Sequence, residues 1–271
     1  MNKIRPLIRW AGGKVWLTDF LQNHVPAYFG NYHEPFLGGG SVFLALKSSG
    51  KINNLAFLSD ANKDLIETFT VIRDHPIELI DEMVPFQNTK EFYYSLRGNI
   101  PDTSISRAAR FLFLNRTSFN GIYRVNLKGE YNVPYGFRKM EYLFKEDEIH
   151  ALSEALKDTF LRATDFDHTI TNIKPGDLVF LDPPYTVAHE NNGFVKYNQK
   201  IFAWEDQQRL RTYIDKIIEI GAHFILTNAA HISISELYDG VGNSLKLARP
   251  SLIGGKGAKR SVYHEILFSN I

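Results

Sequence analysis

Residues 178–185 read Leu-Val-Phe-Leu-Asp-Pro-Pro-Tyr: four apolar residues, then an acid, two prolines and an aromatic ring. The apolar run predicts a buried strand, and the prolines end it because they cannot donate to a sheet. Pro183 and Pro184 have no N–H groups, so they leave pure acceptors beside the Asp182 carboxylate. Such acceptors suit a ligand that presents an amino group, and Tyr185 offers that ligand a flat face. The same residues also fit a plain turn from strand to loop.

A glycine cluster lies upstream in residues 34–41, which read Glu-Pro-Phe-Leu-Gly-Gly-Gly-Ser. A short strand is expected before it, and Ser41 is expected to cap a helix after it. Such a turn lets a cofactor approach the backbone, although many α/β proteins use one for packing alone. Asp60 ends the next apolar strand, 55–60. Its carboxylate could accept the ribose hydroxyls of a nucleoside cofactor or cap the helix that follows.

The remaining pattern alternates strands with helices. Helices are expected at 62–74 and 205–220, and further strands at 223–228 and 262–268. Alternation of this kind predicts an α/β fold, a doubly wound Rossmann-like sheet with its ligand site at the carboxyl ends of the strands. The middle of the chain departs from this alternation of strands and helices. It is helical and then rich in glycine and asparagine, with a hairpin expected at 120–135. We therefore expect a catalytic domain of residues 1–63 plus 158–271 and an inserted domain of residues 64–157.

Composition narrows the class of protein. The chain has 271 residues, 44% of them hydrophobic, so a full core can be buried. The absence of cysteine excludes disulfides, thiolate zinc sites and iron–sulfur clusters. No segment resembles a signal peptide or a membrane span, which predicts a cytoplasmic protein. The nine histidines are scattered, and no metal site is expected.

Positive charge is concentrated in one segment. The whole chain carries a net charge of +1, but residues 107–139 hold seven basic residues and one acid. A second stretch without acids, which includes Lys256, Lys259 and Arg260, precedes the last strand. Runs of charge usually mark a solvated face, but here the first run is interleaved with aromatic residues. The combination favours a polyanionic partner.

The residues Trp-Ala-Gly-Gly-Lys at 10–14 form a third motif. Taken alone, they fit a core tryptophan followed by a turn. The Gly-Gly-Lys lacks the spacing of a phosphate-binding P-loop, which disfavours a nucleotide triphosphatase.

Together these motifs resemble the Dam family of N6-adenine DNA methyltransferases in its alpha-group motif order. The resemblance covers nearly the whole chain. It implies a site-specific methyltransferase that uses S-adenosylmethionine, releases S-adenosylhomocysteine and flips its target adenine out of double-stranded DNA. It also implies a bacterial or phage origin, and a monomer is the expected state. The matching stretches are 10–14, 34–43, 59–65, 109–135, 181–185 and 227–228.

The resemblance implies roles for individual residues of this chain. Asp182 and the Pro183 carbonyl would hold the target amine, Pro184 would stiffen the loop, and Tyr185 would stack on the flipped base. Phe194 and Tyr197 would line the substrate side. The implied cofactor contacts are Trp10, Lys14, Glu34, Phe36, Gly38, Gly40, Asp60, Asp165, Phe166 and Asp182.

The segment 115–135 resembles the recognition hairpin of enzymes that methylate the adenine of GATC. Arg124 and Arg9 would each contact a guanine, Ile122 and Pro134 would touch a thymine methyl group, and Phe119 would intercalate. Thr117-Ser118 and the order of residues 136–139 depart from the family's best-known form, so another site containing GAT stays open. The implied DNA contacts are Arg9, Arg116, Phe119, Asn120, Ile122, Arg124, Asn126, Pro134, Arg138, Lys139, Lys256, Lys259 and Arg260.

Two alternatives remain at this stage. The Asp-Pro-Pro-Tyr pattern tolerates cytosine N4, RNA adenine or a glutamine amide as the methyl acceptor. The chain could also be a DNA-binding relative that has lost catalysis, although such relatives usually lose the acid or the glycine turn, and both are intact here.

Overall fold

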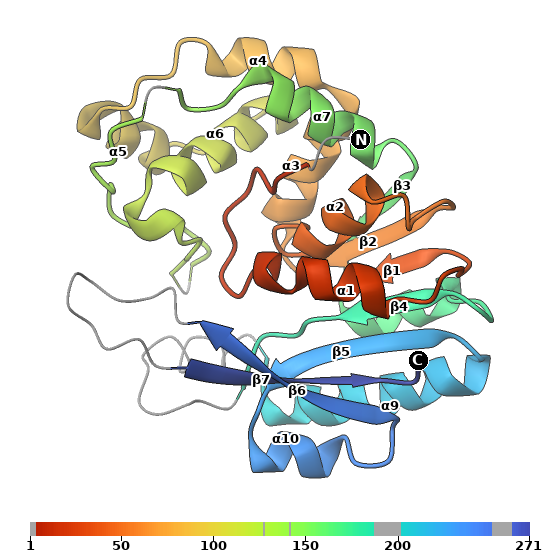
Figure 1. Cartoon of the computed structure of the whole chain (residues 1–271). Coiled ribbons are helices and arrows are strands. Elements are labelled where there is room, and N and C mark those ends of the chain that lie inside the picture. The colour runs from red at the N-terminus through yellow and green to blue at the C-terminus, as the bar shows by residue number, and fades with distance from the viewer. Residues whose placement is uncertain (1–3, 127, 141, 187–201, 251–261) are drawn as a thin grey trace. The chain divides into compact units, whose positions relative to one another are not determined.

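The computed structural model describes residues 4–126, 128–140, 142–186, 202–250 and 262–271 (Figure 1). The chain forms two compact units, and it passes between them more than once. Unit 1 comprises Met1–Gln22 and Leu37–Thr164, and unit 2 comprises Asn23–Phe36 and Asp165–Ile271. These units are defined by packing. The functional boundary at residues 64–157 stays a prediction.

Unit 1 combines two parallel strands with a group of helices. The strands β2 (Ala56–Asp60) and β3 (Thr159–Ala163) pair in parallel, with Asp60 opposite Ala163. Side chains cap the N-termini of three helices. Asn62, Thr89 and Thr103 each accept a hydrogen bond from the backbone N–H three residues further along the chain. The helical elements are η1 (Val15–Leu17), α1 (Thr18–His24), α2 (Ser41–Ser48), α3 (Lys63–Asp74), α4 (Pro76–Met83), α5 (Lys90–Gly98), α6 (Ser104–Thr117), η2 (Phe119–Gly121) and α7 (Glu146–Leu156); α1 ends in unit 2.

An aromatic core fixes the segment that follows α6. Tyr93 of α5 donates a hydrogen bond to the Val133 carbonyl at 2.8 Å, and its ring packs on Tyr135. The isolated antiparallel bridge Val125–Tyr131 lies within residues 120–135, where the sequence predicts a hairpin, and a second bridge joins Tyr135 to Ser118, just before that range. The buried members of this core are Tyr93, Phe113, Leu114, Tyr131, Val133 and Tyr135.

Unit 2 is built on a mixed sheet in the order β1-β4-β5-β7-β6. The first three strands are parallel, and β7 is antiparallel to both β5 and β6. Helix α9 packs its apolar residues, among them Leu210 and Ile214, against the strands. The elements are β1 (Tyr32–Glu34), η3 (Phe166–Asn172), β4 (Leu178–Leu181), α9 (Trp204–Ile220), β5 (His223–Ala229), α10 (Ile232–Leu237), β6 (Asn243–Pro250) and β7 (Val262–Ser269).

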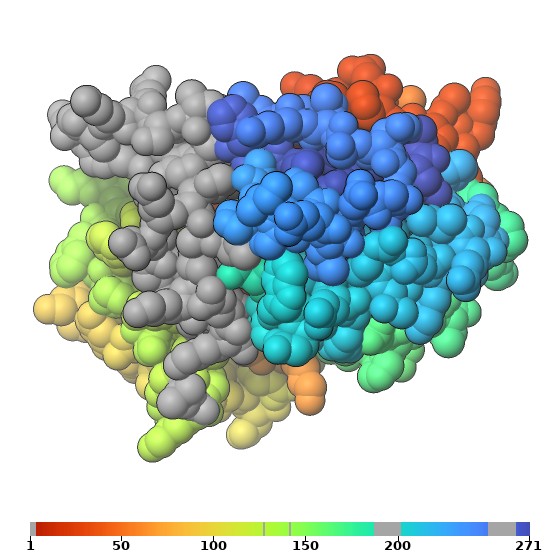
Figure 2. All heavy atoms as spheres, turned by 90° about the horizontal axis from the view of Figure 1, so that it is seen from below, coloured from red at the N-terminus to blue at the C-terminus, as the bar shows by residue number. Residues whose placement is uncertain are grey.

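Strand β6 forms an edge of this sheet, and its residues 243–246 are exposed. Figure 2 shows the surface of this C-terminal part of unit 2 in cyan to dark blue. No helix in the described part of the chain is long and apolar enough to cross a membrane.

The structure confirms the α/β class and most of the expected elements. The strands expected at 55–60, 178–182, 223–228 and 262–268 are present, as are both helices, and Gly221 ends α9 with a φ of 83°. The expectation that Ser41 caps α2 is wrong. Gly40 holds the cap position in a left-handed conformation, and the Ser41 hydroxyl instead accepts the Lys14 N–H at 3.1 Å.

Candidate functional site

The glycine turn lies tightly against the N-terminal loop of unit 1. Gly38 and Gly40 have φ values of +49° and +69°, a region that other residues rarely adopt. A Cβ at Gly38 would lie 2.7 Å from Cδ1 of Trp10, so no larger residue fits without a shift. The sequence-expected cofactor contacts Trp10, Gly38 and Gly40 are therefore brought together.

Asp60 connects this turn to the start of α3. Its carboxylate accepts the Gly38 N–H at 3.0 Å and the Asn62 N–H at 2.9 Å. Burial raises the pKa of Asp60, while the backbone N–H groups of Asn62, Gly38 and Ala61 oppose that rise. Asn62, rather than Asp60, caps the helix. A carboxylate has about four acceptor sites, so Asp60 keeps acceptor capacity for hydroxyls of a ligand.

Lys14 is the second charged group near the turn. Its side chain is only 2% exposed, and Nζ donates to the Gly12 carbonyl at 2.9 Å. Its main chain is anchored by Ser41, the residue that follows the glycines. A buried ammonium at this position can bind an anionic part of a ligand.

In unit 2, Asp182 follows the carboxyl end of β4. Its Oδ1 accepts a hydrogen bond from the Thr227 hydroxyl of β5 at 2.8 Å. Because Leu181 and Leu226 are parallel partners, the Thr227 hydroxyl lies beside the end of β4. Asp182 is half-buried.

Tyr185 is held by a glutamate that the sequence analysis did not single out. The Tyr185 hydroxyl donates to Oε2 of Glu265 at 2.7 Å, and Glu265 of β7 is 3% exposed. The two residues are 80 positions apart. This hydrogen bond restricts the position of the ring just after the two prolines.

Three phenylalanines of unit 2, Phe36, Phe166 and Phe202, cluster with ring centroids 5.3 to 5.9 Å apart. Arg209 lies over the Phe166 ring at 4.8 Å and donates hydrogen bonds to Asp165 at 2.7 Å. Arg209 was also not expected from the sequence. The structure thus brings the expected pair Asp165 and Phe166 together with Phe36. Phe166 and Phe202 are buried, so the half-buried Phe36 is the ring of this cluster that can present an apolar face to a planar ligand.

Glu34 lies on β1 and is buried. It accepts the Tyr32 hydroxyl at 2.7 Å, and burial together with this carboxylate raises the pKa of Tyr32. This bond gives Glu34 a structural role within unit 2, whether or not it also contacts a cofactor.

The segment expected to contact DNA presents several side chains on unit 1. Phe119 is 54% exposed, and Asn120 after it has a φ of 57°. Arg124 is exposed, and its Nε donates to Oδ1 of Asn132 at 2.8 Å. The other expected contacts on this segment are Ile122 and Asn126, which are half-buried, and Pro134, Arg138 and Lys139, which are exposed.

Arg9 lies beside the start of that segment. The Asn115 side chain of α6 accepts the Arg9 N–H at 2.9 Å and donates to the Arg9 carbonyl at 2.8 Å. A Cβ on Gly121 would lie 2.5 Å from Cδ of Arg9. Arg9 and the predicted hairpin segment therefore form one local surface. Asn115, which holds the Arg9 backbone, is a further residue that no sequence motif singled out.

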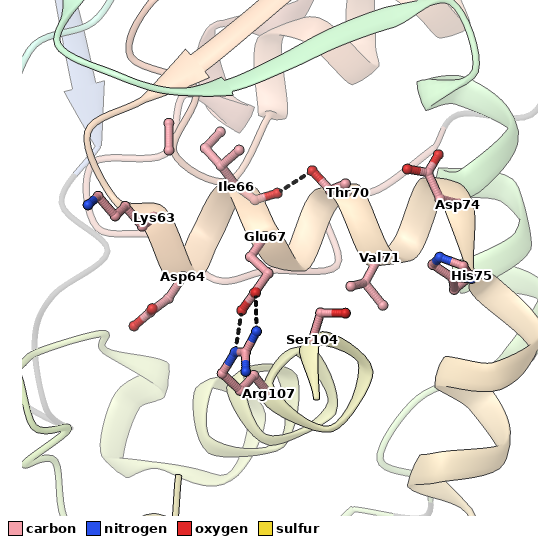
Figure 3. A pocket seen from close by; sticks show the side chains of 11 residues that line it. Lys63, Asp64, Ile66, Glu67, Thr70, Val71, Asp74, His75, Ser104 and Arg107 are labelled. Carbon is pink, nitrogen blue, oxygen red and sulfur yellow. Dashed lines mark hydrogen bonds and ion pairs between the residues drawn. The ribbon is translucent and has the colours of Figure 1, made fainter. Parts of the chain in front are cut away.

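Part of the basic run has a structural role. Arg107 pairs with Glu67 of α3 at 2.6 Å (Figure 3), and Arg110 donates to the Leu96 carbonyl at 2.8 Å. Arg116, expected to contact DNA, lies over the Phe144 ring at 5.7 Å. Three of the basic side chains between residues 107 and 139 are therefore engaged in contacts within the protein.

An open hollow of about 580 Å³ runs along α3. Figure 3 shows Asp64, Glu67, Asp74 and Arg107 among the side chains that line it. It contains none of the residues expected to bind cofactor or DNA.

Some expectations cannot be placed. Lys256, Lys259, Arg260, Phe194 and Tyr197 lie outside the described residues. Within the described residues, no group of three or more histidines and carboxylates is arranged to hold a metal ion.

An α/β chain with a glycine turn, an acid at the end of β2 and Asp-Pro-Pro-Tyr after β4 has the features of methyltransferases that act on the amino group of a base. The chain belongs to the D12 class of N6 adenine-specific DNA methyltransferases, because the sequence profile of that family matches residues 10–249. The resemblance to Dam-type enzymes is thereby confirmed.

Three relatives that match nearly the whole of this chain support the assignment. The chain is 33% identical to a type II methyltransferase of Lactococcus lactis subsp. cremoris, over 99% of this chain and 97% of that protein. It is 31% identical to the DNA adenine methylase of Escherichia coli K12, over 97% and 94% of the two chains. A DNA N-6-adenine-methyltransferase of Escherichia phage P1 is 35% identical over 97% of this chain and 35% of the phage protein.

Proposed function

We propose that this protein transfers a methyl group from S-adenosylmethionine to N6 of adenine in double-stranded DNA, with GATC as its recognition sequence. The observation that carries the proposal is the arrangement after β4. There Asp182 is oriented by the Thr227 hydroxyl, and Tyr185 is fixed by Glu265. The family supplies the acceptor class, DNA adenine.

The residues present fit the proposed cofactor in each unit. In unit 1, Asp60 has the acceptor capacity for ribose hydroxyls, the glycines let Trp10 pack directly on the turn, and Lys14 can bind a carboxylate. In unit 2, the partly exposed Asp165 carboxylate and the half-buried Phe36 ring suit an adenine, because they combine a hydrogen-bond acceptor with an apolar face. When bound, the cofactor supplies an activated methyl group, so the chain needs to provide only positioning and oriented acceptors.

Asp182 and the Pro183 carbonyl would accept hydrogen bonds from the two hydrogens of the target amine. This pull favours tetrahedral geometry at N6 and frees its lone pair, which in adenine is delocalised into the ring. The methylated nitrogen must lose one proton, and its hydrogen bond to the Asp182 carboxylate offers a path for that proton. Tyr185 would stack on the base, with its hydroxyl held at Glu265.

The target adenine must leave the duplex, because base pairing buries its N6. Unstacking a base costs a few kcal/mol. Phe119, exposed at the start of the hairpin segment, is suited to fill the space that the base leaves. Stacking on Tyr185 offsets a further part of the cost.

Arg124 is proposed to contact a guanine in the major groove. Its guanidinium is exposed and is oriented by Asn132, which prepares it for bidentate bonding. We expect Arg124→Ala to lose about 1–3 kcal/mol of discrimination between GATC and sites with the guanine replaced. Digestion of methylated plasmid with methylation-sensitive enzymes measures this loss, and unchanged selectivity would contradict the assigned role.

The direct test of the activity is mass analysis of nucleosides from a GATC duplex incubated with enzyme and S-adenosylmethionine. We expect N6-methyladenine with the wild type and none with Asp182→Ala. Much of the DNA affinity should survive in that variant, since Asp182 is not among the residues expected to form the DNA-binding surface. Methylation of cytosine instead of adenine would show that adenine N6 is not the acceptor. Full activity of Asp182→Ala would contradict the role proposed for its carboxylate.

A further inference from the structure

Tyr123 links two parts of unit 1 that the proposed function keeps separate. Its ring stacks on Trp10, with centroids 5.3 Å apart and an interplanar angle of 26°. Its hydroxyl donates to Oδ2 of Asp64 at 3.0 Å. Trp10 lies against Gly38, and Asp64 lies in the first turn of α3, two residues after Asn62, whose N–H bonds to Asp60. Tyr123 therefore contacts Trp10, which packs on the proposed cofactor turn, and the first turn of the helix whose start is bonded to Asp60.

The same residue belongs to the segment that carries the proposed DNA contacts. Ile122 and Arg124 are its chain neighbours. The backbone on either side is fixed, because the Tyr131 hydroxyl donates to the Ile122 carbonyl at 2.8 Å and the Asn132 N–H donates to the Arg124 carbonyl at 3.1 Å. The Tyr123 ring itself also packs on Tyr131. Because Tyr123 and Arg124 are adjacent in this fixed stretch of backbone, we expect a displacement of the Tyr123 ring to change the position of Arg124.

We propose that Tyr123 is a positioning residue that couples cofactor binding to DNA recognition. The inference rests on the proposed function, because it assumes that Trp10 contacts the cofactor and Arg124 contacts DNA. A cofactor that orders Trp10 also orders the ring stacked on it, so less conformational freedom remains to be lost when DNA binds. By linkage, DNA strengthens cofactor binding by the same factor.

The experiment measures the affinity of a fluorescent GATC duplex by anisotropy, with and without saturating S-adenosylhomocysteine. The ratio of the two dissociation constants is the coupling factor. For the wild type we expect it to be roughly tenfold. In Tyr123→Ala it should fall to about one, because both links to the cofactor turn are removed.

Two conservative variants separate coupling from folding. Tyr123→Phe keeps the stack on Trp10 and loses the bond to Asp64, and Asp64→Asn weakens the same bond from the other side. Each should lose part of the coupling factor, and the double variant should lose no more than Tyr123→Phe alone. Tyr94→Ala is the matched control. Tyr94 lies in the same unit, is 37% exposed and has Arg97 over its ring, so its removal should leave the ratio unchanged.

A purely structural role for Tyr123 would lower the two DNA affinities by similar factors and leave their ratio intact. A wild-type coupling factor in Tyr123→Ala and Tyr123→Phe, or a wild-type protein with no coupling, would overturn the inference. The proposed function is judged separately by methyl transfer in the wild type. An enzyme that methylates GATC but keeps its coupling without Tyr123 refutes only the inference.

Discussion

Two carboxylates that follow parallel strands differ in their partners. Asp60 accepts backbone N–H groups of the glycine turn and of the start of α3, whereas Asp182 accepts a side-chain hydroxyl from the neighbouring strand. Asp60 is thus part of the framework of its site, whereas Asp182 is oriented by the Thr227 hydroxyl. This difference matches the roles proposed for them, ribose binding and amine binding.

The pKa of Asp60 makes its role testable. Burial raises it above the ordinary value of 3.8. Ribose hydroxyls that donate to the carboxylate would favour its charged form, so the pKa should be lower in the complex. Affinity for S-adenosylhomocysteine should therefore increase as the pH rises through the pKa of the free protein, about tenfold for each unit by which binding lowers it.

Calorimetric titrations from pH 3.8 upward measure this dependence. Asp60→Asn has no titrating group there, so its affinity should be weaker and flat over the same range. A variant that keeps the wild-type pH dependence would show that another group is responsible.

The bond between Tyr185 and Glu265 should contribute to stability. Tyr185→Phe keeps the ring but removes one donor from a glutamate that is 3% exposed. We expect the free energy of unfolding to fall by about 1–3 kcal/mol, measured by urea denaturation. Tyr28→Phe is the control, because Tyr28 is 89% exposed in the same unit and should change stability by less than about 0.5 kcal/mol. Equal stability of Tyr185→Phe and the wild type would mean that the bond contributes nothing.

At the scale of elements, the start of α3 connects the strand β2 to the cofactor turn. Asn62 caps this helix by accepting the Leu65 N–H at 3.0 Å. Asn62→Ala should lower the free energy of unfolding by about 1 kcal/mol, and Asn62→Gly by only a few tenths. Urea denaturation compares the two, and equal losses would show that the side-chain cap is not the cause.

Elements with strong local signals could be predicted from the sequence. The apolar runs of β2, β4 and β5 and the apolar face of α9 depend on neighbours in the chain. Strands β3 and β6 were not expected, because both lie at sheet edges and carry exposed residues. Their main stabilisation is pairing with β2 and β7, which no local pattern reveals.

The candidate site likewise combines residues that local sequence motifs identify with residues that only the fold brings into place. The turn, the strand-end acids and the Asp-Pro-Pro-Tyr motif are contiguous patterns, so the sequence could identify them. Glu265 and Arg209 act on residues 80 and 44 positions away, so their roles appear only once the chain is folded. Ser41 was misassigned because the Lys14 backbone, 27 residues away, competes for its hydroxyl.

At the scale of the whole molecule, the net charge is only +1, so DNA affinity depends on where the exposed basic side chains lie. Lys139 is exposed on the hairpin side, whereas Arg107 is paired with Glu67. Lys139→Ala should reduce the slope of log affinity against log salt by about one. Arg107→Gln should leave that slope unchanged. Anisotropy titrations at several salt concentrations measure both, and equal slopes for Lys139→Ala and the wild type would remove Lys139 from the interface.

The most direct test of the central claim is modified-base sequencing of DNA from a bacterial host that lacks adenine methylation and expresses this chain. The account predicts N6-methyladenine at GATC throughout the genome with the wild type, and none with Asp182→Ala present at equal levels. A genome without N6-methyladenine despite folded wild-type protein, or one methylated equally by both proteins, would contradict it.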